Sequence, residues 1–156
     1  MAEVWKILFF VDDDGSKPVT DYLLTLSKGE RDRFETRLEM LREKGLSATK
    51  HLVTKLEENL YELRLLNSPN NSRFLHCALS SDGRRLCVLH GFSKTGKTND
   101  KVPESEKRIA QARRDIIEER ERKIREVLEF QNVIEQKRTT NIRQKKGRKW
   151  KPNKPK

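Results

Sequence analysis

The alternation of apolar and polar residues predicts a strand and then two helices in the first third of the chain. Residues 5–11 form a continuous apolar run that ends at three aspartates, which is typical of a strand covered on both faces. Apolar side chains recur at helical spacing over residues 18–26 and again from residue 30, and Gly45 is placed to cap the second helix. These two helices form a helical hairpin whose apolar stripe we expect to pack on a sheet.

Four short segments in the middle of the chain have the composition of strands, at residues 51–56, 60–66, 73–80 and 85–92. An Asp-Gly pair between the last two predicts a hairpin. A two-residue turn there would pair Cys77 with Val88. Cys77 and Cys87 would then lie on opposite faces, so we expect small core residues rather than a disulfide. No group of residues has the spacing of metal ligands, and no metal site is predicted.

A long helix is predicted after Pro103 and ends near Arg138. Its first half carries an apolar stripe at Ile109, Ala112 and Ile116. A second apolar group follows a highly charged stretch and is a candidate contact with another chain: Ile124, Val127, Leu128, Phe130 and Ile134. The order of elements predicts an α+β domain with a small, mostly antiparallel sheet, an N-terminal helical hairpin on one face and a C-terminal helix.

Charge is distributed unevenly along the 156 residues, so the net charge of +11 does not describe the folded part. Residues 137–156 hold ten Lys or Arg and no Asp or Glu, which leaves 25 basic and 24 acidic residues in 1–136. A nearly neutral body argues against a uniformly basic protein that coats nucleic acid. We divide the chain into a domain at 1–120, a helical extension at 121–138 and a basic, disordered tail at 139–156.

Neither membrane insertion nor export is expected from the sequence. The apolar run over residues 7–11 is too short for a membrane span or a signal peptide, and aspartates follow it directly. The sequence therefore predicts a cytoplasmic location and no membrane partner.

Basic side chains gather in a series of short motifs along the predicted strands and the loop that follows them. The motifs are Lys55-Leu56, Leu60-Tyr61-Glu62-Leu63-Arg64, Arg73-Phe74, Leu89-His90-Gly91-Phe92-Ser93-Lys94 and Lys97-Thr98, with Ala110, Ala112, Arg113 and Arg114 on the final helix. In this order they resemble the RelE/ParE superfamily of toxins from type II toxin–antitoxin systems, and most of all its HigB-like, phage-derived branch. The resemblance covers about residues 4–120. The sequence departs from the branch in two places. Residues 99–102 separate the Lys-Thr motif from Pro103, where the branch usually has proline directly after the motif, and the segment from about residue 123 onward is longer than a minimal toxin needs.

The resemblance implies a RelE-like fold and a ribosome-dependent, metal-independent RNA endonuclease. Such an mRNA interferase cuts messenger RNA in the ribosomal A site and so inhibits translation, without a cofactor. The implied partners are the ribosome, mRNA and a cognate antitoxin of the helix-turn-helix type that blocks the basic cleft. Attack of a 2′-OH on the adjacent phosphate needs a base, positive donors for the developing charge and an acid for the 5′-oxygen.

Arg64 and Arg73 suit the phosphate, because guanidinium groups bind phosphate through two hydrogen bonds and keep their charge. Glu62 lies on the same strand face as Arg64 and is a candidate for the base. An ordinary ion pair between Glu62 and Arg64 explains the same spacing, so both interpretations stay open.

His90, Lys94 and Lys97 are the other candidates for proton transfer and RNA contact. Lys94 and Lys97 would clamp the RNA backbone, and either could act as the base; solvated loop lysines are the alternative. His90 would donate a proton to the leaving oxygen. His90 also alternates in step with Val88 and Phe92, so a packed histidine is an equally good interpretation.

The basic tail is a candidate RNA contact, because clustered cations neutralise phosphates and an aromatic side chain stacks on bases. We hypothesise that it docks on ribosomal RNA; a solvated tail is the alternative. The predicted RNA-binding residues of the loop and tail are Lys97, Lys101, Lys145, Lys146, Arg148, Lys149 and Trp150.

A non-catalytic binding protein is the second hypothesis, either a gyrase poison of the ParE kind or an RNA-binding phage accessory protein. A ParE-like poison is expected to lack the base and the acid of the nuclease. This chain retains Glu62, His90 and the loop lysines, which favours the nuclease.

Overall fold

The structure is a computed structural model that describes residues 4–47, 52–65, 68–79, 83–94 and 101–147, with side chains as far as residue 143. The chain divides into two compact units, Met1–Glu119 and Arg120–Lys156. The predicted division at residues 120 and 138 into domain, extension and tail stays a prediction.

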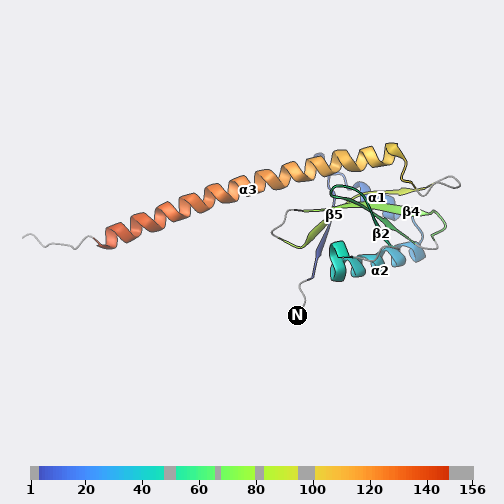
Figure 1. The fold of residues 1–156 in the computed structure, drawn as a ribbon, viewed down its shortest axis with the longest axis horizontal. Helices are drawn as coiled ribbons and strands as arrows, with labels where there is room; N and C mark the ends of the chain where they lie inside the picture. Colours follow the sequence, from blue (N-terminus) through green and yellow to red (C-terminus); the bar gives the residue numbers. More distant parts are fainter. Residues whose placement is uncertain (1–3, 48–51, 66–67, 80–82, 95–100, 148–156) are drawn as a thin grey trace, which may run out of the picture. The chain divides into compact units, whose positions relative to one another are not determined.

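One five-stranded sheet organises the first unit (Figure 1). The elements in chain order are β1 (Lys6–Phe9), α1 (Pro18–Leu24), α2 (Lys28–Lys44), the short 3-10 helix η1 (Gly45–Ser47), β2 (Val53–Glu57), β3 (Leu60–Arg64), β4 (Ser72–Ala78), β5 (Arg85–Ser93) and α3 (Glu104–Gly147). The strand order is β1-β5-β4-β3-β2, with β1 parallel to β5 and every other pair antiparallel. The predicted α+β class, with a mostly antiparallel sheet, a helical hairpin and a C-terminal helix, is confirmed.

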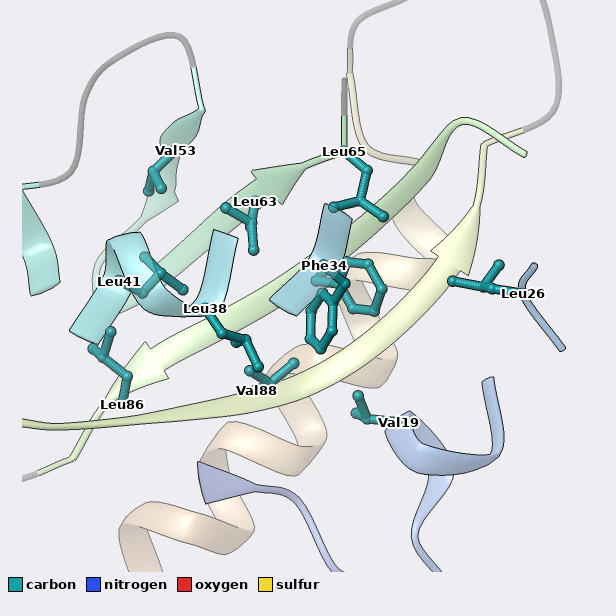
Figure 2. Close-up of a cluster of buried hydrophobic side chains, with 11 residues drawn as sticks. Val19, Leu26, Phe34, Leu38, Leu41, Val53, Leu63, Leu65, Leu86 and Val88 are labelled. Carbon is teal, nitrogen blue, oxygen red and sulfur yellow. The ribbon is translucent and has the colours of Figure 1, made fainter. Parts of the chain in front are cut away.

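The two faces of the sheet carry separate apolar cores, because alternate residues of each strand point to opposite faces. On one face Leu63 and Val88 pack against Phe34 and Leu38 of α2 (Figure 2). On the other face a second cluster packs on the first turns of α3, formed by Leu60, Leu75, Cys77, Cys87, Leu89, Phe92 and Ala110. The sheet is therefore the middle layer of the first unit.

Local sequence signals set both ends of α2: Gly45 caps its C-terminal end as predicted, whereas the helix begins at Lys28, two residues before the predicted start. The Ser27 hydroxyl accepts a hydrogen bond of 3.3 Å from the Glu30 amide, which satisfies one free donor of the first turn. Gly45 caps the other end with φ 53°, a left-handed value that favours glycine. A Cβ at Gly45 would lie 2.1 Å from the Trp5 ring. The absence of a side chain at Gly45 therefore also allows the Trp5 ring to pack against the hairpin.

The prediction that the first strand is covered on both faces is wrong. β1 is a short edge strand, and Leu8 is 43% exposed while Ile7 and Phe9 pack toward the hairpin. A short apolar run fits a central strand and an edge strand equally well, so sequence periodicity cannot separate them.

The predicted apolar stripe on the last helix is confirmed for Ile116 and wrong for Ile109 and Ala112, because the buried face is rotated. Ala110 is fully buried and Ile116 and Ile117 are partly buried, whereas Ile109 is 39% exposed and Ala112 is exposed. The helix also continues to Gly147 and does not end near residue 138. Within the described residues, no helix has the apolar length that a membrane span requires.

The two cysteines do not lie on opposite faces as predicted. Cys77 pairs directly with Cys87 across β4 and β5, both are buried in the same cluster, and both are free thiols. The prediction assumed a two-residue Asp-Gly turn, which would pair Cys77 with Val88. The observed register is shifted by one residue, and one such shift exchanges the faces.

Gly91 is required where α1 packs on β5. A Cβ at this position would lie 2.7 Å from the Tyr22 ring and 2.9 Å from the Phe74 ring. We expect Gly91→Ala to lower the free energy of unfolding by about 1–3 kcal/mol in urea denaturation, because both rings must shift. Gly83→Ala is the matched control, since its nearest neighbour, the Arg85 Nε, is 3.4 Å away. Equal midpoints for the two variants would contradict this explanation.

Candidate functional site

The sheet face that packs on α3 carries two neighbouring rows of functional side chains. In one row Glu62, Leu75 and His90 are partners across β3, β4 and β5; in the next row the partners are Arg64, Arg73 and Phe92. Adjacent strands lie about 4.8 Å apart, so both rows fit within the footprint of a few nucleotides. We call Glu62, Arg64, Arg73, His90 and Phe92 the β3–β5 site.

A one-residue β-bulge brings His90 into this site. His90 pairs with Leu75, but the next pair along β4 is His76 with Val88, which leaves Leu89 as the extra residue. The expected alternation of His90 with Val88 is therefore wrong, although the alternation with Phe92 holds. The bulge turns His90 from the hairpin face to the α3 face.

Glu62 is the anchor of the two arginines. Its Oε1 accepts a hydrogen bond from Arg64 Nε at 2.7 Å and from Arg73 Nη1 at 3.0 Å. Glu62 and Arg73 are buried, with side chains 1% and 6% exposed, whereas the Arg64 side chain is 27% exposed. The ion pair predicted between Glu62 and Arg64 is present, and Arg73 joins it from the neighbouring strand.

Two polar atoms of this cluster remain without a hydrogen-bond partner in the described part of the chain, Glu62 Oε2 and Arg73 Nε. Burying ionised groups in this way costs free energy that their mutual attraction only partly offsets. In return, the two guanidinium groups are held in fixed positions, so they can donate hydrogen bonds to an anion without first being reorganised.

His90 is held from both sides by α3. Its Nε2 is paired with a Glu106 carboxylate oxygen, and its Nδ1 lies 3.1 Å from Arg113 Nη1, which also donates to the Leu89 carbonyl at 2.9 Å. Because Arg113 can only donate, the ring is the neutral form with its proton on Nε2. Burial lowers the pKa of His90 below its ordinary value and outweighs the opposing effect of Glu106. Phe92 stacks on the ring at 5.4 Å between centroids.

Glu106 is a functional candidate that the sequence prediction missed, and Arg113 had been noted only as part of the resemblance. Glu106, Ala110 and Arg113 are four and three residues apart, which puts them on one face of a helix. That spacing was available in the sequence. It became informative only after the structure placed Ala110, and not Ala112, against the sheet.

A hydrogen-bond network on the opposite face fixes the loop before Arg73. The buried Glu30 carboxylate of α2 accepts from Ser68, from Asn70 Nδ2 at 2.8 Å and from Ser72 at 3.3 Å. Because Ser72 is the first residue of β4, this network sets where Arg73 enters the sheet.

Lys94 is positioned by the same loop. Its backbone amide donates to the Asn71 carbonyl at 3.2 Å, and Asn71 Nδ2 donates to the Lys94 carbonyl at 3.4 Å. Tyr22 supports the end of β5 from the hairpin side, with its hydroxyl 2.8 Å from both Ser72 Oγ and Ser93 Oγ. Lys94 therefore leaves β5 beside the strand start that carries Arg73.

Among the predicted RNA-binding residues, Lys101 has a side chain that the structure describes. Lys101 is exposed before α3, and no contact joins it to the β3–β5 site in the described residues. Lys97, Arg148, Lys149 and Trp150 lie outside the described residues, as do the side chains of Lys145 and Lys146 in α3. Their RNA contacts stay a prediction. Among the described residues, no group of His, Cys, Asp or Glu side chains has the arrangement of a metal site.

The family model described as "Phage derived protein Gp49-like (DUF891)" matches residues 21–115 of the chain. The chain belongs to the Gp49-like family. The match covers more than half of the sequence and includes the whole β3–β5 site with Glu106 and Arg113. The family is known for RelE/HigB-like toxins, so the Gp49-like chain is a toxin-like protein. A comparison with curated proteins found no match.

Proposed function

We propose that this Gp49-like chain is the toxin of a toxin–antitoxin module and acts as a ribosome-dependent, metal-independent mRNA endonuclease. The observation that carries the proposal is the pair of guanidinium groups, Arg64 and Arg73, that Glu62 holds beside His90 on one sheet face. A cytoplasmic ribosome would present the mRNA, and a helix-turn-helix antitoxin would neutralise the toxin by covering this face.

In the proposed reaction the 2′-oxygen of one nucleotide attacks the adjacent phosphorus. The O2′–P bond forms and the P–O5′ bond breaks, which leaves a 2′,3′-cyclic phosphate and a free 5′-hydroxyl. The phosphorane carries additional negative charge, and donors fixed in advance stabilise it more than mobile ones do. Arg64, the more exposed guanidinium, would contact the phosphate first, with Arg73 behind it.

His90 suits the base better than the acid expected from the sequence. Burial lowers its pKa, so the ring is neutral near pH 7 and ready to accept the 2′-OH proton. Arg113 donates toward Nδ1, and turning this guanidinium to the phosphate would free the lone pair. Lys94 would supply the proton that the leaving 5′-oxygen takes up. Glu62 is then the residue that positions the arginines.

Induced expression followed by mapping of transcript ends tests this proposal. We expect cleavage within codons that stops when translation is blocked. Arg64→Ala should reduce cleavage about 10²-fold or more, since it removes one donor to the transition state. Thermal stability should change little, because Arg73 still pairs with Glu62. Arg108→Ala, an exposed arginine on α3, is the matched control and should cleave normally.

Two outcomes would reject the nuclease. If Arg64→Ala and Arg108→Ala cleaved mRNA at the same rate, the β3–β5 site would not take part in the reaction. Intact transcripts, with growth arrest and DNA damage, would favour the gyrase poison instead.

A further inference from the structure

The second unit presents a row of exposed apolar side chains along α3. We call residues 120–143 the α3 extension. Six of its large apolar side chains are between 47% and 66% exposed, namely Ile124, Val127, Leu128, Phe130, Val133 and Ile142. Ile134 is half-buried. A helix in water rarely leaves so many apolar side chains uncovered unless another surface packs on them.

Most of these apolar residues lie on one side of the helix. Successive residues of a helix are rotated by about 100°, which places all of them except Val133 on the same half of the α3 extension. The opposite half is polar and includes Arg125, Glu129, Asn132 and Gln136. The stripe is densest over residues 124–134, about 15 Å of helix, and Ile142 continues it about two turns further on, after the polar residues 135–141.

Charge indicates what covers the stripe. Residues 120–156 hold fourteen Lys or Arg and four Asp or Glu, a net charge of +10 out of the +11 of the whole chain. A second copy paired in parallel would bring two such basic segments together, and these would repel. Residues 121–136, which carry most of the stripe, hold three Lys or Arg and four Glu, so the positive charge lies at Lys137 and beyond. A partner with acidic residues beside its apolar seam would be attracted to this basic segment.

We propose that the α3 extension binds an acidic amphipathic helix of a partner protein along its apolar stripe. Leucine or isoleucine side chains of the partner would pack between Ile124, Val127 and Ile134, with the partner's carboxylates beside Lys137 and the basic residues that follow. The α3 extension lies outside the segment matched by the Gp49-like family and contains no residue of the β3–β5 site. The inference therefore stands whether or not the chain is a nuclease.

Binding of two synthetic peptides to the full-length chain tests the charge preference. Both peptides have about four heptads with leucine at the core positions; one carries glutamate at the flanking positions and the other lysine. We expect the glutamate peptide to bind and the lysine peptide to bind at least about tenfold more weakly in fluorescence anisotropy. Added salt should narrow this difference, since it screens the flanking charges.

Two triple variants test the surface. The stripe variant, Val127→Gln, Leu128→Gln and Ile134→Gln, should weaken binding of the glutamate peptide by at least about tenfold. The control variant, Arg125→Gln, Glu129→Gln and Gln136→Ala, changes the polar half and keeps the net charge, so its affinity should not change. Circular dichroism establishes that both variants remain helical.

Three results would overturn the proposal. The first is equal affinity for the two peptides, or equal affinity of the two variants. The second is a concentration-dependent dimer in sedimentation that the stripe variant abolishes, because a second copy would then occupy the stripe. The third is binding to vesicles of phosphatidylserine and phosphatidylcholine that the stripe variant removes while peptide binding persists.

Discussion

Glu62→Gln is expected to lower the free energy of unfolding by about 3–5 kcal/mol, since removing one partner leaves a buried charge uncompensated. The Arg73 side chain is only 6% exposed, and the Glu62 carboxylate is its acidic partner. Glutamine keeps the shape and one acceptor oxygen of glutamate, so the loss reports the charge and not a cavity. Urea denaturation of the purified chain measures it.

Glu58→Gln is the matched control for the same chemical change. Glu58 pairs with Lys55 at 3.3 Å, but its side chain is 93% exposed, so we expect a loss of about 1 kcal/mol at most. A double variant, Glu62→Leu with Arg73→Met, should recover most of the lost stability, because an apolar pair of similar volume avoids the cost of buried charge. It should not recover cleavage.

The same series separates the two roles considered for Glu62. A positioning residue affects folding and cleavage together, and the double variant then restores folding alone. A general base would behave differently: Glu62→Gln would abolish cleavage and leave the free energy of unfolding near that of Glu58→Gln. That second pattern would reject the anchor role assigned from the contacts of Arg64 and Arg73.

Local sequence rules were sufficient for the part of the site that depends on strand alternation. Glu62 and Arg64 are two residues apart on one strand, so they had to share a face, and the resemblance added Arg73. The position of His90 could not be predicted in this way. A bulge at Leu89 shifts the alternation by one residue, and neither Leu89 nor His90 is a glycine or proline that would indicate it.

Tertiary contacts decided the features that the sequence left open. Helical spacing allowed several faces of α3 to be the buried one, and packing selected Ala110, which placed Glu106 and Arg113 on His90. The contact of Glu30 with Ser68 joins residues 38 positions apart and has no local signature. Polar contacts of this kind are recognisable only after the chain has been folded.

His76 should make the fold lose stability as the pH falls from about 6.5 to about 4. The ring is 1% exposed and stacks on Tyr61 at 5.5 Å, and neither ring nitrogen has a hydrogen-bond partner in the described residues. Burial lowers the pKa of His76 from 6.5 to about 4. Between these values the unfolded chain binds a proton that the folded chain does not, so the unfolded state is favoured.

The size of this effect follows from the same pKa difference. Each pH unit within the window is worth about 1.4 kcal/mol, so the full loss is about 3 kcal/mol, with no further contribution from His76 above or below it. His76→Phe keeps an aromatic ring on Tyr61 and removes the titration. Subtracting the unfolding free energies of this variant from those of the unchanged chain cancels the contributions of the carboxylates and of His90, because these groups titrate in both proteins.

The difference in unfolding free energy between the unchanged chain and His76→Phe should therefore be constant above about pH 6.5. It should change steadily, to the disadvantage of the unchanged chain, as the pH falls to about 4. At pH 7 His76→Phe should be as stable as the unchanged chain or more so, because it no longer buries an unpaired N–H group. If the plots of unfolding free energy against pH ran parallel for the two proteins over the whole range, the His76 ring would be charged or hydrated in the folded state. The apolar core between the hairpin and β4 would then not be dry at this position.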